Sequence, residues 1–175
     1  STLKQKMITF KKLKVGFLLL FVFINFFYTA PCFSLSSRED LFKNALELTA
    51  GGNFNLALQE WNSYLDFFPD DAAAFSNRGN VRLVIGDVEG SIDDQNKAIS
   101  LDPSEIDPYI NRGIAKEALG LWSQAKKDYM FVIDKDSTNF SALYNLANVE
   151  GSLSNWDKAR DLFSKAAIYN PGFAM

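Results

Sequence analysis

The sequence contains no histidine and only one cysteine, Cys32. The lack of histidine excludes Ser–His–Asp and Cys–His catalytic arrangements and removes the commonest metal ligand. A single cysteine forms neither an internal disulfide nor a thiolate metal cluster. We therefore expect no catalytic residue, no metal site, no cofactor and no small-molecule substrate, and we predict that the protein is not an enzyme.

A basic block is also missing from the body of the chain. The 175 residues include 18 Lys and Arg against 21 Asp and Glu, which gives a formal net charge of −3. Nucleic-acid-binding domains instead concentrate Lys and Arg on one face. This composition argues against a nucleic-acid partner.

One long apolar run lies near the N-terminus. Residues 15–33 read VGFLLLFVFINFFYTAPCF, without a charge, and follow a lysine-rich flank at residues 1–14. A helix over this run would rise about 28 Å, which is the hydrocarbon thickness of a bilayer. The predicted membrane-anchoring side chains are Phe17, Leu18, Leu19, Leu20, Phe21, Phe23, Ile24, Phe26 and Phe27.

Two interpretations of this run remain open. Its length and its lysine-rich flank favour a retained membrane span, with a linker at 34–37 leading to a domain on the lumenal or extracytoplasmic side. A basic flank, an apolar stretch and small residues near Ala30 and Ser34 also fit a cleaved secretory signal. Cleavage would leave a soluble lumenal or periplasmic protein.

The rest of the chain repeats itself. The stretch AAAFSNRGN (72–80) returns as IDPYINRGI (106–114) and more faintly as FSALYNLAN (140–148), each 34 residues after the last. The chain divides without gaps into units at 38–71, 72–105, 106–139 and 140–173.

Within a unit, position 4 is large and apolar: Leu41, Phe75, Tyr109 and Leu143. Position 8 is small: Ala45, Gly79, Gly113 and Ala147. Position 15 suits a turn: Gly52, Gly86, Gly120 and Ser154. Position 20 is small: Ala57, Ser91, Ala125 and Ala159.

This pattern resembles the tetratricopeptide repeat, over residues 38–173. The resemblance implies an all-α fold, a right-handed superhelix of four helix–turn–helix units, preceded here by one N-terminal hydrophobic helix. Small residues let the two helices of a unit approach, and glycine ends the first helix. Neighbouring units cover the apolar face that one unit cannot bury alone.

The resemblance also places the first helix of each unit along a concave groove. Position 6 there holds Asn77, Asn111 and Asn145, and position 9 holds Asn80 and Asn148. An amide can donate to a peptide carbonyl and accept from a peptide N–H, so these residues are predicted to hold an extended partner segment by its backbone. The alternative is that the amides satisfy groups within the fold.

Arg78 and Arg112 follow at position 7 and complete the set of candidate groove residues. These arginines could bind an acidic partner, or they could pair with Asp93, Asp94 or Asp128 of the adjacent helices. Pairing within the fold is the favoured interpretation. Of the residues that relatives use to clamp acidic chaperone tails, only Asn77 is matched. Recognition of such a tail is therefore disfavoured.

Two further features are interpreted as structural. Trp122 and Trp156 share position 17, where the family packs an aromatic residue, and both are expected in the core. Asp93 and Asp94 are consecutive and do not face each other on a helix, so the pair is expected on a solvated face.

The phrases AAAFSNRGNVRLVIGDVEGSIDD and DPYINRGIAKEALGLWSQAKKDY look like tetratricopeptide proteins of cyanobacteria and chloroplasts that assist photosystem assembly. The resemblance implies a membrane-tethered scaffold for protein partners, with its repeats on the lumenal side of the thylakoid. The alternatives are a soluble lumenal adaptor and the regulatory array of a longer protein.

Overall fold

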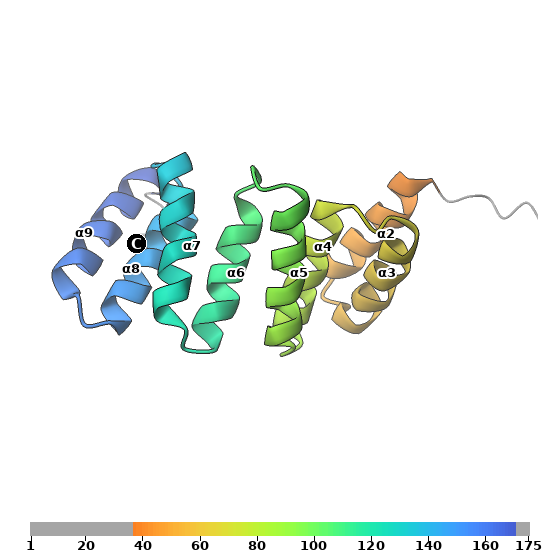
Figure 1. The fold of residues 1–175 in the computed structure, drawn as a ribbon, viewed down its shortest axis with the longest axis horizontal. Helices are drawn as coiled ribbons and strands as arrows, with labels where there is room; N and C mark the ends of the chain where they lie inside the picture. The colour runs from red at the N-terminus through yellow and green to blue at the C-terminus, as the bar shows by residue number, and fades with distance from the viewer. Residues whose placement is uncertain (1–36, 171–175) are drawn as a thin grey trace, which may run out of the picture. The chain divides into compact units, whose positions relative to one another are not determined.

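The computed structural model describes residues 37–170, which form eight α-helices and no strand within that range (Figure 1). In chain order the helices are α2 (Arg38–Ala50), α3 (Phe54–Phe67), α4 (Ala72–Val84), α5 (Val88–Leu101), α6 (Asp107–Ala118), α7 (Trp122–Lys135), α8 (Phe140–Ser152) and α9 (Trp156–Tyr169). The all-α repeat fold is as predicted. The proposed span at 15–33 and its anchoring residues lie outside the described residues. Between residues 37 and 170, no helix combines the length and apolarity that a membrane crossing requires.

The helices pack in chain order along the array. Each first helix, namely α2, α4, α6 and α8, packs against the second helix that follows it, and α4, α6 and α8 also pack against the second helix that precedes them. The first helices also contact one another from unit to unit, while among the described residues the second helices do not. The first helices therefore line the inner surface, which is the surface that the groove hypothesis needs.

Turns between paired helices fall at the predicted position 15. Gly52, Gly86 and Gly120 have φ values of 75°, 90° and 69°, and Ser154 has a φ of 64°. This left-handed conformation suits glycine because a Cβ atom is strained there. The fourth unit uses the same turn without the residue that adopts it most readily.

Close helix pairing explains the small residues at position 8. A Cβ atom added to Gly113 would lie 2.5 Å from Cε1 of Tyr129. One added to Gly79 would lie 2.6 Å from Nε2 of Gln95. The glycines thus make room for buried side chains of the second helix.

The buried interior contains two apolar clusters at opposite ends of the array. One centres on Trp61 and Tyr64 of α3, and the other on Tyr129 and Val132 of α7. Between them, Ser91, Asp94 and Gln95 of α5 are buried polar residues. The middle of the array therefore buries polar side chains, of which Asp94 is paired with Arg78 and Arg82.

The expectation for position 17 is wrong for one tryptophan. Trp122 is partly buried against the second cluster, but 69% of Trp156 is exposed. Helix α8 of the next unit packs against α7, and Trp122 packs against the cluster to which both helices contribute. Among the described residues no further helix covers α9, so the same position stays open to solvent.

Candidate protein-binding groove

The candidate asparagines all lie on the first helices and are all partly buried. Nδ2 of Asn77 donates to the carbonyl oxygen of Ala73 at 2.9 Å. Nδ2 of Asn111 donates to Oγ of Ser76, on the neighbouring first helix, at 3.3 Å. Each bond uses one of several hydrogen-bonding positions of its amide. The amides thus contribute to the fold and keep capacity for a partner.

Asn80 is oriented by a buried neighbour. Nε2 of Gln95 donates to Oδ1 of Asn80 at 3.2 Å and to the carbonyl oxygen of Ser76 at 3.0 Å. Gln95 is fully buried. Because Oδ1 of Asn80 is the acceptor in this pair, its NH₂ group remains as a donor on the inner surface.

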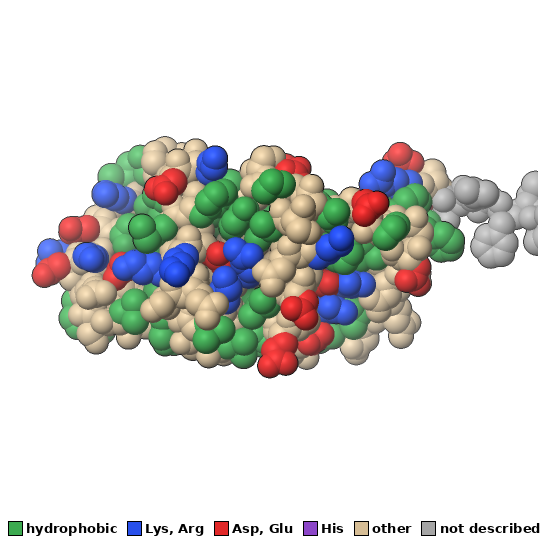
Figure 2. Space-filling view, in the orientation of Figure 1, with side chains coloured by type: hydrophobic (Ala, Val, Ile, Leu, Met, Phe, Trp, Pro, Cys, Tyr) green, Lys and Arg blue, Asp and Glu red, His purple; other side chains and the backbone are tan. Residues whose placement is uncertain are grey.

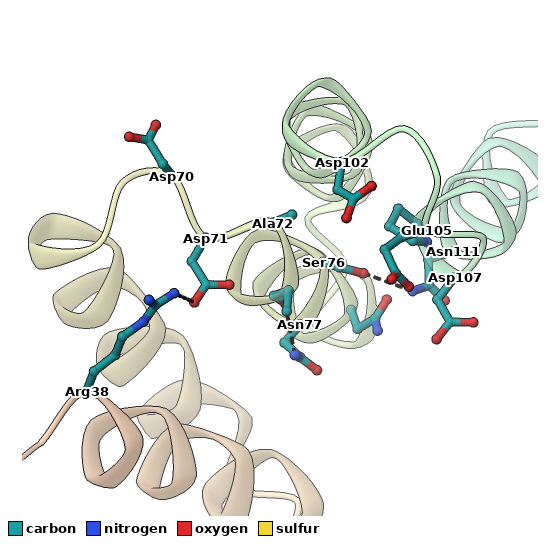
Figure 3. Close-up of a pocket in the computed structure, with 13 residues that line it drawn as sticks. Arg38, Asp70, Asp71, Ala72, Ser76, Asn77, Asp102, Glu105, Asp107 and Asn111 are labelled. Carbon is teal, nitrogen blue, oxygen red and sulfur yellow. Dashed lines mark hydrogen bonds and ion pairs between the residues drawn. The ribbon is translucent and has the colours of Figure 1, made fainter.

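A cavity of about 400 Å³ opens between the first three units (Figure 3), within the size range typical of ligand sites. Its lining includes three of the five predicted asparagines, Asn77, Asn80 and Asn111, together with Ser76. Asn145 and Asn148 lie farther along the array, on α8, and do not line it. The structure therefore brings part of the predicted amide ladder to one concave site.

Arg78 is held within the fold. Its Nε and Nη2 donate to the two carboxylate oxygens of Asp94 at 2.9 and 2.7 Å, and its Nη1 donates to Oδ1 of Asn62 at 2.9 Å. Arg82 adds a second cation 3.1 Å from Asp94. This arrangement matches the intramolecular ion pair that the sequence favoured for Arg78.

Arg112 repeats these contacts one unit later. It donates to Asp128 at 3.0 and 2.6 Å and to Oδ1 of Asn96 at 2.8 Å. Lys116 lies 2.7 Å from the same carboxylate. Each arginine therefore joins the second helix of its own unit to that of the preceding unit, and neither lines the cavity.

The expectation for the acidic pair at 93–94 is wrong for one member. Asp93 is exposed, whereas Asp94 is 3% exposed and paired. Successive helix residues lie about 100° apart around the axis, so one of two neighbours can face inward while the other faces solvent.

At one edge of the cavity, Arg38, Tyr64 and Asp71 form a hydrogen-bonded triad. Arg38 donates to the Tyr64 hydroxyl at 2.9 Å and to Asp71 at 2.7 Å, and Tyr64 donates to Asp71 at 2.6 Å. Burial acts to raise the pKa of Asp71, but hydrogen bonds from Tyr64, Arg38 and the Ala74 amide outweigh it and hold that pKa below its usual value. The carboxylate is thus ionised and already occupied.

Sequence reasoning missed the acidic residues that line the cavity, Asp70, Asp71, Asp102, Glu105 and Asp107. All five lie in the loops before α4 and α6 or at the start of α6. Their accumulation at the unit boundaries is visible in the sequence. Only the packed array shows that two successive boundaries open onto one cavity.

Comparison with known proteins supports the repeat assignment. The sequence profile of the Tetratricopeptide repeat family matches residues 42–106 and 110–172. The chain belongs to the tetratricopeptide repeat family. Such repeats are protein–protein interaction scaffolds, which fits the inner surface described above.

Related proteins contain repeats that are similar to those of this chain. The chain is 28% identical to human Tetratricopeptide repeat protein 6 over 71% of its own length and 24% of that protein. It is 28% identical to Small glutamine-rich tetratricopeptide repeat-containing protein 2 of Saccharomyces cerevisiae, over 59% of this chain and 30% of that protein. The chain thus spans less than a third of these relatives.

Solved structures show the same fold. The crystal structure of MamA superposes with a TM-score of 0.71 at 21% identity, covering 79% of this chain and 81% of MamA. The first tetratricopeptide domain of Spaghetti (RPAP3), bound to the HSP90 peptide SRMEEVD, superposes with a TM-score of 0.65 at 24% identity, covering 68% of this chain and 94% of that domain. Identities at this level establish the shared fold.

Proposed function

We propose that this tetratricopeptide protein is a non-enzymatic scaffold that holds a protein partner in its concave groove and is tethered to a membrane by residues 15–33. The observation that carries the proposal is the cavity where Asn77, Asn80 and Asn111 converge. Amides on the inner surface suit the backbone of an extended segment. The Spaghetti domain with its bound peptide supports a peptide-binding role for such an array.

The groove proposal is tested by replacing Asn77, Asn111 and Asn145 with alanine. The affinity-tagged protein is expressed in the organism that naturally makes it. Its partners are chemically crosslinked to it in native membranes and are then isolated with it. The matched control replaces three exposed asparagines off the cavity, Asn44, Asn53 and Asn55. We expect the groove variant to lose partners that the control retains, with equal helical circular dichroism. Equal recovery from both folded variants would refute the groove as the binding surface.

The membrane tether is supported by the uncharged run at 15–33 and the lysines before it. The test is an alkaline carbonate wash of native membranes followed by intact-mass analysis of the protein. A tethered scaffold stays in the pellet with 15–33 intact. Release of a chain that starts near Phe33 would instead support the soluble lumenal adaptor.

Within this proposal the partner belongs to a membrane protein complex, and the chain acts as an assembly factor or accessory subunit on the lumenal side. The phrases at 72–94 and 107–129 support a thylakoid photosystem as that complex, through their resemblance to photosynthetic tetratricopeptide proteins. Comigration with photosystem subunits on native gels of solubilised thylakoids would support this assignment. Comigration only with non-photosynthetic complexes would refute it.

A further inference from the structure

The cavity lining carries a strong excess of negative charge. Its thirteen residues include five acids, Asp70, Asp71, Asp102, Glu105 and Asp107, and one base, Arg38. Figure 3 shows Asp102, Glu105 and Asp107 on the same side of the cavity as Asn111, and Asp71 facing Arg38 across from them. On the face shown in Figure 2, by contrast, acidic, basic and hydrophobic side chains are interspersed.

The one base does not neutralise this excess. Arg38 lies 2.7 Å from Asp71 and also donates to Tyr64. Considering the described residues alone, the other four acids have no Lys or Arg nitrogen within 4.0 Å. The cavity lining therefore keeps an excess of negative charge, most of it on solvent-exposed carboxylates.

Glu105 and Asp107 carry charges that the repeat does not require, and so does Asp70, whose equivalents are Ser104 and Thr138. In the units before and after, the residues equivalent to Glu105 are Asp71 and Asn139, which cap α4 and α8 by accepting from backbone amides at 3.0 Å. Glu105 caps nothing, because α6 begins without a side-chain cap. At the position of Asp107 the neighbouring units have Ala73 and Ser141.

Asp102 has a structural role in addition to its place in the lining. It accepts hydrogen bonds from the amide and hydroxyl of Ser104 at 3.0 and 2.6 Å, and Asp136 makes the same contacts with Thr138 one unit later. These bonds lower the pKa of Asp102, so it remains charged. Among the acids between α5 and α6, the charges specific to this cavity are thus those of Glu105 and Asp107.

Amide oxygens add further acceptors. Nδ2 of Asn77 and of Asn111 is directed to Ala73 and Ser76, which leaves Oδ1 of both asparagines as an acceptor for another group. Carboxylates and amide oxygens together form a lining that is rich in acceptors. Lysine offers three donors and arginine five, each with a positive charge, so these side chains match the lining in both respects.

We infer that the cavity binds a lysine or arginine side chain of an extended partner segment, whose backbone lies on the asparagines of the groove. This inference rests on the proposed function and specifies its partner: a basic segment. The four carboxylates without a cation would repel an acidic tail.

The test measures binding of fluorescent decapeptide mixtures to the full chain in mild non-ionic detergent by anisotropy. The mixtures share a randomised neutral background and carry lysine, arginine, glutamate or glutamine at two central positions. We expect the lysine or arginine mixture to bind about tenfold more tightly than the glutamate mixture. The difference should shrink when NaCl is raised from about 50 to about 500 mM, because salt screens the charges.

The decisive variant combines Glu105→Gln with Asp107→Asn. Its control, Glu89→Gln with Asp93→Asn, removes the same charge from exposed residues of α5 off the cavity. We expect the first variant to lose the preference for basic mixtures and the control to keep it. Basic binding that both variants retain equally would overturn the inference.

Other outcomes separate this inference from the proposed function. Glutamate or glutamine mixtures that bind as tightly as basic ones, and weaken when Asn77 and Asn111 are replaced, would overturn the charge preference and leave the groove function standing. Failure of every mixture to bind would overturn the inference and count against peptide capture itself.

Discussion

Arg78 and Asp94 form a bidentate ion pair inside the second repeat. Both carboxylate oxygens accept hydrogen bonds from the guanidinium, at 2.9 and 2.7 Å. The side chains are 15% and 4% exposed. Arg112 and Asp128 repeat the pair one unit later. The fourth unit has Leu146 and Leu162 at these positions, so the array fills the same space in two chemically different ways.

Replacement of Asp94 by alanine should strongly destabilise the protein. The change leaves Arg78 and Arg82 without their shared carboxylate, and breaking a buried ion pair from one side costs about 3–5 kcal/mol. Chemical denaturation followed by circular dichroism measures the effect. Asp93→Ala, on the exposed neighbour, is the control and should change stability little. Similar losses from both variants would contradict the structural role of the pair.

Joint replacement of Arg78 and Asp94 by leucine should be far less harmful than Asp94→Ala. Apolar residues of similar volume can substitute for a buried pair with little or no net cost, and the fourth unit already uses them. Arg82 also loses Asp94 in this variant but keeps Asp87 and the Gly90 carbonyl oxygen, so the free energy of unfolding should lie between that of Asp94→Ala and that of the parent. A loss as large as that of the single variant would show that the pair itself is needed.

Ser154→Gly should stabilise the protein. Ser154 has a φ of 64°, where glycine avoids the strain of a Cβ atom, worth about 1–2 kcal/mol. The thermal midpoint should rise. The reciprocal change, Gly120→Ser at a φ of 69°, should lower it. If both variants moved the midpoint in the same direction, the account of this turn would fail.

Stability should fall in acid partly through Asp71. Its pKa is lower in the folded protein, so its contribution is present above the ordinary aspartate pKa and is lost as pH falls through the folded value. Urea denaturation measured at several pH values across this range should show a smaller loss of unfolding free energy for Asp71→Asn than for the parent. Asp70→Asn, at the exposed neighbour, should follow the parent curve. Parallel curves for all three proteins would exclude this role.

The two tryptophans at opposite ends should behave differently. Trp61 is fully buried and its Nε1 donates to Thr49 at 3.0 Å, whereas Trp156 is 69% exposed. Trp61→Ala should cost about 3–5 kcal/mol, as for other large-to-small core changes. Trp156→Ala should cost much less and should remove most of the acrylamide-quenchable fluorescence. Comparable destabilisation by both would mean that α9 is covered in the full protein.

The repeat pattern could predict the helices and turns because both depend on local spacing. Glycine at Gly52, Gly86 and Gly120 indicates a left-handed turn, and the small residues at position 8 indicate close helix pairing. The helical phase that buries Asp94 and exposes Asp93 was visible only in the folded structure. Exposure of Trp156 depends on the lack of a covering helix within the described residues, which its repeat position does not reveal.

The candidate site was predictable in part. Asparagine spacing identified the amides of Asn77 and Asn111, since a 34-residue period returns a side chain to the same face of the array. Spacing within one unit could not predict the cavity. Glu105 belongs to one unit boundary and Asp71 to another, and they share a cavity only after the units have stacked.

The most direct test of the central claim is site-specific photocrosslinking in native membranes. A photoreactive amino acid is placed at Ala73, which is exposed and lines the cavity, or at Asp134, which is exposed on α7 and off the cavity. We predict a discrete protein crosslink from position 73 that disappears when Asn77, Asn111 and Asn145 are replaced by alanine, and none from position 134. A crosslink from position 134 alone, or one from position 73 that survives the alanine replacements, would contradict binding in the groove.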